Sequence, residues 1–260
     1  LSLINIDVAT SYAKKIRPQQ ERRVVKDRSV SLLVKEKSFA AFDMTYDYDF
    51  SQRRGSDFQV NEQSRNAQNQ RLRRFNLADR QRQQHKFWLG YQLTPSINTD
   101  VNVFYARDDY NRTDVGLSDA TDKGLELTLS GASGMIDWNA YYSYQIIGYR
   151  RSGSDNLGAE NWWGTTQSAT NQFGINVALP QLIEQVLSMS LNYHYTDGVV
   201  KNTLSQARSS DHSNYPDSHY RQIRLGAELN YVLSSNETII GKLIIERNND
   251  PDYFYFNAEI

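Results

Sequence analysis

One feature constrains this chain more than any other, namely the repeated alternation of apolar and polar residues with a period of two. The clearest case spans residues 42–50, where Phe, Met and Tyr occupy every second position and Asp and Thr lie between them. Such alternation is typical of a β-strand with one apolar and one polar face. Because the pattern recurs about a dozen times, it predicts an all-β, antiparallel chain of about 12 strands.

The predicted strands fit the thickness of a membrane. They lie at 4–12, 30–34, 42–50, 87–93, 101–105, 125–129, 136–146, 173–179, 187–195, 223–231, 239–245 and 254–260. Most approach the roughly 9–11 residues of a tilted membrane strand, whereas no apolar run approaches the roughly 18 residues of a membrane helix. The mean hydropathy of -0.67 does not exclude a barrel, because only alternate residues of its strands face lipid.

The predicted connections alternate between short and long. Short connections lie at 36–38, 94–97, 131–134, 180–185 and 234–236, and long ones at 14–27, 51–84, 107–122, 150–168 and 197–219. The exception is the brief connection at 247–251. Short periplasmic turns opposite longer extracellular loops are typical of outer-membrane barrels. We therefore expect one domain over residues 1–260, a transmembrane β-barrel in the bacterial outer membrane.

The alternation also assigns side chains to the two faces of the wall. Polar residues expected to face the lumen are Asp43, Asp47, Asp49, Asn192, His194, Arg224 and Glu228. Residues expected to face lipid are Phe42, Tyr46, Tyr48, Leu191, Tyr193 and Leu225. The 17 Tyr residues and the Trp residues at 88, 138, 162 and 163 fit aromatic girdles at the membrane interfaces.

Charge and cysteine content restrict the partners and cofactors. The 29 Lys and Arg residues nearly balance the 30 Asp and Glu residues, so nothing suggests nucleic acid as a partner. Without cysteine the chain has no CxxCH motif and attaches no haem covalently. The basic stretch Arg71–Arg80 is either a solvated loop or a segment that contacts lipopolysaccharide phosphates or lines a pore mouth.

Candidate metal and catalytic residues are few. Asp108, Asp109 and Asp114 could bind Ca²⁺ in a loop, although their spacing does not match the EF-hand and a solvated acidic loop is the more ordinary interpretation. His194 is more simply a polar wall residue than a ligand. No GxSxG or HExxH spacing occurs, so we assign no catalytic residues and expect no enzyme. An outer-membrane barrel enzyme with Ser and His on its outer wall is a remote alternative.

Several segments resemble one family. They are RLRRFNLADR at 71–80, YQLTPSINTDVNVFYARDDY from 91, NWWGTTQSATNQFGINVALPQL from 161, and NYPDSHYRQIRLGAELNYVL from 214. Together they resemble the MtrB/PioB type of decaheme-cytochrome-associated outer-membrane barrel over about residues 70–255. The chain is much shorter than members of that family and lacks the CxxC that some carry. We therefore expect it to correspond to the C-terminal portion of such a barrel. Its ending departs from the family pattern, with Ile260 in place of the usual terminal Phe.

The resemblance implies a function. Members of that family enclose a multihaem c-type cytochrome and form an electron conduit across the outer membrane, so the haem would be carried by a partner protein. Outer-membrane lipid and lipopolysaccharide would surround the wall. The main alternative is a porin-like channel for small solutes. A closed barrel of about twelve strands would favour the channel, because its lumen is too narrow for a cytochrome.

Overall fold

The computed structural model describes residues 4–16, 22–39, 42–57, 72–73, 78–110, 115–154, 161–183, 186–206, 213–214, 216–234 and 236–249. Within these ranges only the backbone is described for residues 37–39, 42, 72–73, 206 and 213–214. No helix that could cross a membrane occurs in this part of the chain. The expected strand at 254–260 lies outside the described residues.

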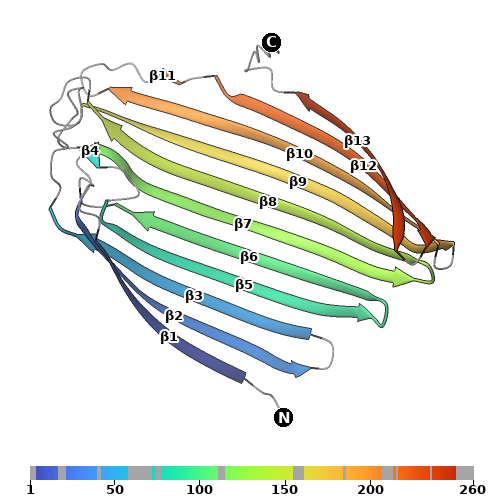
Figure 1. Ribbon diagram of the computed structural model, residues 1–260. Coiled ribbons are helices and arrows are strands. Elements are labelled where there is room, and N and C mark those ends of the chain that lie inside the picture. The colour runs from blue at the N-terminus through green and yellow to red at the C-terminus, as the bar shows by residue number, and fades with distance from the viewer. Residues whose placement is uncertain are drawn as a thin grey trace.

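The described residues form one large antiparallel sheet (Figure 1). Its long strands are β1 (Ile4–Ile16), β2 (Val24–Phe39), β3 (Phe42–Gly55), β5 (Arg80–Thr94), β6 (Ile97–Asp109), β7 (Val115–Ser133), β8 (Ile136–Gly153), β9 (Trp162–Ile183), β10 (Leu187–Gln206), β12 (Ser218–Ser234) and β13 (Glu237–Asn249). Each pairs with the next along the chain, and β1 and β13 are the two edges. The short β4 (Leu72–Arg73) pairs with β7 in parallel, unlike the other described pairs, and β11 (Ser213–Asn214) pairs with β10.

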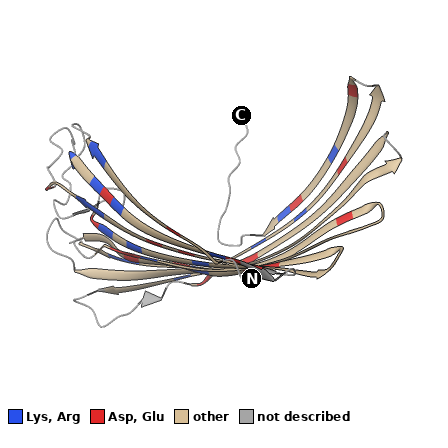
Figure 2. Ribbon diagram, turned by 90° about the horizontal axis from the view of Figure 1, so that it is seen from below, with Lys and Arg blue, Asp and Glu red and all other residues tan. Residues whose placement is uncertain are grey.

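The sheet is strongly curved, as the view in Figure 2 shows. Its strands rise from the middle of the sheet towards both ends. Such coiling follows from the right-handed twist of each strand, which accumulates over a wide sheet. The all-β antiparallel class predicted from the alternation is confirmed.

The strands are longer than the sequence pattern predicts. The eleven long strands contain 13–22 residues, whereas about 9–11 suffice to cross the lipid. The segment 107–122, expected as a loop, instead holds the end of β6 and the start of β7, so that only 110–114 connect them. The prediction failed because polar residues occupy both faces of this segment, a composition that is typical of a loop. The strands nevertheless remain paired with their neighbours through the segment.

The sorting of connections by length persists. Short turns lie at 40–41, 95–96, 134–135, 184–186 and 235–236, all at one end of the sheet. The other end carries the connections at 17–23, 56–79, 110–114, 154–161 and 207–217. Charged residues also gather towards this long-loop end (Figure 2). Both features mark the two ends of the sheet as chemically different.

The register divides the side chains into two faces. Directly paired residues share a face, and one such row joins Tyr46, Phe87, Val103, Leu125 and Tyr144. We call the face that carries this row the apolar face. Most of its large side chains are exposed, including Phe87, Val103, Leu125, Tyr142, Phe173, Leu191 and Leu225. The opposite side, which carries Asp47 and Lys86, is the polar face.

Candidate functional site on the polar face

One register row shows that the expected lumen residues share the polar face. It runs across eight strands, β3 to β12, through Asp43, Gly90, Asp100, Thr128, Tyr141, Gly174, His194 and Arg224. Asp47, Asp49, Asn192 and Glu228 belong to neighbouring rows of the same face. The sequence therefore sorted these residues correctly between faces. That the polar face lines a lumen stays a prediction at this point.

The expected lipid-facing residues share the apolar face. Tyr46, Tyr48, Leu191, Tyr193 and Leu225 all belong to its rows. The backbone of Phe42 pairs with Tyr91 in the same set of rows, although its side chain lies outside the described part.

Neutral hydrogen-bonding groups are frequent on the polar face. One row joins Asn98, Ser130, Asn139, Asn176 and Asn192 across five strands. Two rows further from the short turns lies Asn102, whose Nδ2 donates to Glu126 Oε2 at 2.9 Å. Amides and hydroxyls both donate and accept hydrogen bonds, so this surface can bind water or another polar surface without a strong net charge.

His194 is built into this wall. The Tyr141 hydroxyl lies 2.5 Å from Nδ1 of His194, and the Thr196 hydroxyl lies 2.9 Å from Nε2. Both ring nitrogens therefore have hydroxyl partners. This arrangement fits the expected role of a polar wall residue rather than a metal ligand or a catalytic base.

Aromatic rings cover glycines on the polar face, which the sequence analysis missed. A Cβ on Gly90 would lie 2.6 Å from the Trp88 ring, and one on Gly174 would lie 2.3 Å from the Tyr141 ring. Trp88 was expected in a girdle that faces lipid, but it pairs with Asn102 on the polar face. Trp162 also lies on this face, opposite Gly153. The girdle assignment of these two tryptophans is therefore wrong.

The apolar face also holds a residue that the sequence analysis passed over. His85 lies among tyrosines, with its Nδ1 2.8 Å from the Tyr46 hydroxyl. Its ring centroid lies 4.8 Å from that of Tyr48 and 6.3 Å from that of Tyr105. These contacts give the imidazole a hydrogen-bond partner and aromatic neighbours on the apolar face.

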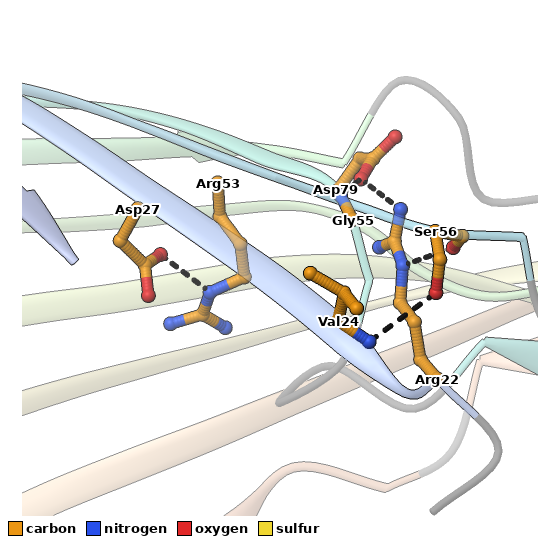
Figure 3. A network of polar contacts seen from close by, with 7 residues as sticks. All are labelled: Arg22, Val24, Asp27, Arg53, Gly55, Ser56 and Asp79. Carbon is orange, nitrogen blue, oxygen red and sulfur yellow. Dashed lines mark hydrogen bonds and ion pairs between the residues drawn. The ribbon is translucent and has the colours of Figure 1, made fainter. Parts of the chain in front are cut away.

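A buried ion pair fastens the long-loop end of β2, β3 and β5 (Figure 3). Arg22 is 3% exposed, its Nη2 lies 2.5 Å from Asp79 Oδ1, and its Nε donates to the Ser56 carbonyl at 2.7 Å. The Gly55 amide also donates to Asp79, at 3.2 Å. Buried charges persist when they are paired and hydrogen-bonded in this way.

This ion pair explains part of the basic stretch 71–80. Ala78 is 1% exposed, Asp79 is paired with Arg22, and Arg80 begins β5. The interpretation as a solvated loop is therefore wrong for residues 78–80, which hold the sheet together. Residues 71 and 74–77 lie outside the described part.

The structure does not assemble the expected Ca²⁺ ligands. Asp108 points towards Arg80 and Arg82, with Nε–Oδ1 distances of 4.0 and 3.5 Å. Asp109 is the next residue on β6 and so points to the opposite face. Asp114 lies outside the described residues, which contain no metal-binding group of three acidic or histidine side chains. Burial and the adjacent Asp108 raise the pKa of Tyr110.

Taken together, the wide meander, its two faces and its loops sorted by length define an outer-membrane β-barrel protein. The chain belongs to the MtrB/PioB family, since the family model described as a putative outer membrane beta-barrel porin, MtrB/PioB, matches residues 2–259. It is 28% identical over 213 residues to outer membrane protein MtrB of Shewanella baltica (strain OS185). The alignment covers 82% of this chain and 31% of that protein. The chain thus spans about a third of the length of that relative.

Solved structures show the same fold. A mutant ferric enterobactin receptor, PfeA of Pseudomonas aeruginosa, superposes with a TM-score of 0.68 at 12% identity, over 95% of this chain and 40% of the receptor. The copper transporter OprC superposes with a TM-score of 0.63 at 10% identity, over 95% of this chain and 37% of the transporter. At such low identity these similarities establish the fold alone.

Proposed function

We propose that this chain forms part of an outer-membrane barrel that encloses and insulates a multihaem c-type cytochrome, so that electrons cross the outer membrane. The observation that carries the proposal is the polar face, a continuous surface of amides, hydroxyls and scattered charges backed by an apolar face. The family membership and the name of the Shewanella relative support it. The chain acts as a scaffold and supplies no chemistry.

The division between faces suits such a sheath. A barrel pairs its backbone groups around a closed sheet, so lipid can surround it without cost from unpaired groups. The apolar face would contact lipid, while rows such as Asn139 and Asn176 would hydrogen-bond the cytochrome or trapped water. Polar protein interfaces of this kind commonly include bridging water.

The width of the sheet also supports a large lumen. Among the described residues β1 pairs only with β2, and β13 only with β12, so these strands do not close a small barrel with each other. Each unpaired backbone group in lipid would cost several kcal/mol. We propose that both edges pair with further strands of the assembled barrel. Lumen diameter grows with strand number, so such a barrel has room for a protein.

Co-purification tests the proposal. The barrel should be extracted from native membranes in mild detergent, and its haem absorption spectrum and haem-to-barrel ratio recorded. We expect covalently attached haem on a separate polypeptide that remains with the barrel through size-exclusion chromatography. A barrel free of haem, isolated from cells that express multihaem cytochromes, would contradict the proposal.

A porin-like channel is the second candidate, because the family description itself uses the word porin. The two functions differ in vesicles. An open channel releases small trapped solutes without a cytochrome, whereas a filled conduit retains them and passes electrons to an internal acceptor only when the cytochrome is present.

The alternative of a barrel enzyme gains no support from His85 and His194, because their ring nitrogens contact tyrosine and threonine hydroxyls rather than serine.

A further inference from the structure

A patch of four cations lies on the apolar face at the long-loop end of β1, β2 and β3. Lys14, Lys26 and Arg54 are directly paired neighbours in one register row. Arg28 lies in the next row towards the middle of the sheet, beside Tyr12. All four side chains are exposed. We call these four residues the basic patch.

The basic patch continues the apolar surface. Along β2, Val30 and Leu32 follow Arg28 on the same face, and on β3 Phe50 lies two rows from Arg54. Two residues of a strand span about 6.6 Å, so the cations begin just beyond the apolar band. The Arg28 guanidinium carbon lies 5.9 Å from the centre of the Tyr12 ring, at this boundary. In an outer-membrane barrel the headgroup region begins at the edge of the apolar band.

The patch surrounds an open hollow of about 560 Å³. Besides the four cations, the described residues that line it are Val24, Gln52, Gly55 and Ser56, and none of these carries a carboxylate. Its wall is held in place, since the Val24 amide donates to the Ser56 hydroxyl at 3.3 Å and Arg22 binds the Ser56 carbonyl (Figure 3). The nearest acidic residue on β2, Asp27, points to the other face and pairs with Arg53 at 3.0 Å.

This concentration of positive charge is unfavourable by itself. Like charges directly opposite each other on neighbouring strands destabilise a sheet. Elsewhere at the long-loop end, cations have acidic partners, as in Arg150–Asp119 at 2.8 Å, Arg221–Asp197 at 3.1 Å and Lys201–Asp217 at 3.3 Å. Among the described residues this row of three cations has no carboxylate partner, so it is suited to an anion supplied from outside.

We infer that the basic patch binds the phosphate groups of a phosphorylated glycolipid of the outer leaflet, the lipid A part of lipopolysaccharide. The inference rests on the proposed topology, in which the long loops are extracellular. Phosphates would occupy the hollow between Lys14, Lys26 and Arg54, and the acyl chains would lie along the adjoining apolar rows. Charge-assisted hydrogen bonds from Arg and Lys to phosphate provide the specificity.

Binding of purified lipid A to the full-length barrel in neutral detergent tests the inference. The variant Lys14→Gln, Lys26→Gln, Arg54→Gln removes the row. The matched control Arg150→Gln, Lys201→Gln, Arg221→Gln removes the same charge from the same end of the sheet. Titration with bisphosphorylated lipid A, followed by native mass spectrometry, should show binding weakened tenfold or more by the first variant and less than twofold by the control.

Competition with other phosphate compounds tests whether the patch is specific for lipid A. Millimolar inorganic phosphate should not displace lipid A, and phosphatidylglycerol should bind at least tenfold more weakly. Equal affinity of the first variant and the parent protein would overturn the inference, as would complete displacement by inorganic phosphate, which would indicate a simple phosphate site. Both variants should retain the cytochrome equally, so failure here is distinguishable from failure of the proposed function.

Discussion

The Tyr141 hydroxyl on β8 reaches across β9 and lies 2.5 Å from Nδ1 of His194 on β10. It can do so because Gly174, the residue of β9 between them, has no side chain. Two residues 53 positions apart are thus joined over a third strand. The polar face is built from non-local relationships of this kind as well as from the alternation.

Gly174→Val should therefore destabilise the barrel. The added Cβ would lie 2.3 Å from the Tyr141 ring, and overpacking of this kind typically costs about 1–3 kcal/mol. Urea unfolding in lipid vesicles measures the change. Gly241→Ala is the control, because a Cβ there meets nothing within 4 Å. Equal effects of the two substitutions would contradict the packing argument.

Arginine substitutions test the two faces. Tyr46→Arg should cost about 2–4 kcal/mol if the residue lies near the membrane midplane, whereas its neighbour Thr45→Arg should cost much less. The same contrast is expected between Leu191→Arg and Asn192→Arg. Unfolding free energies in vesicles provide the comparison, and equal costs within each pair would refute the assignment of the apolar face to lipid.

Cysteine labelling tests the topology cleanly, because the chain has no cysteine. Asp57→Cys, in a long connection, should react with a membrane-impermeant maleimide in intact cells. Ser96→Cys, in a short turn, should react only after the outer membrane is permeabilised. The reverse pattern would invert the topology and would also remove the basis for lipid A binding.

Loss of one partner of the buried ion pair should be severe. Asp79→Ala leaves Arg22 buried without its carboxylate, and such changes cost about 3–5 kcal/mol. Asp197→Ala, which breaks the exposed pair with Arg221, should cost no more than about 1 kcal/mol. Urea unfolding again provides the measurement. A mild effect at Asp79 would mean that water or another group compensates Arg22.

The sequence predicted the features that depend on the residues of a single strand. Period-two alternation assigned Asp47 and Tyr46 to opposite faces, and the sorting of connections separated the two ends of the sheet. The prediction failed for features that depend on pairing between several strands. The extension of β6 and β7 depends on cross-strand pairing of polar residues. The error at Trp88 has another cause, because the alternation along β5 already places Trp88 and Gly90 on the face opposite Phe87 and Leu89, and the girdle assignment overlooked this.

The candidate site was predictable to the same degree. His194 was correctly placed on the polar face, but its partner Tyr141 belongs to another strand and no local pattern links them. Likewise the Arg22–Asp79 ion pair joins residues 57 positions apart. The family-like stretch at 71–80 marked the position of Asp79 without revealing its structural role.

Site-specific photo-cross-linking tests the central claim most directly. A photoreactive amino acid should replace Asn176 on the polar face or the next residue, Val177, on the apolar face. In native cells, activation at position 176 should join the barrel to a haem-containing polypeptide, and activation at 177 should not. Haem-containing products at neither position, or at 177 alone, would contradict the view that the polar face encloses a cytochrome.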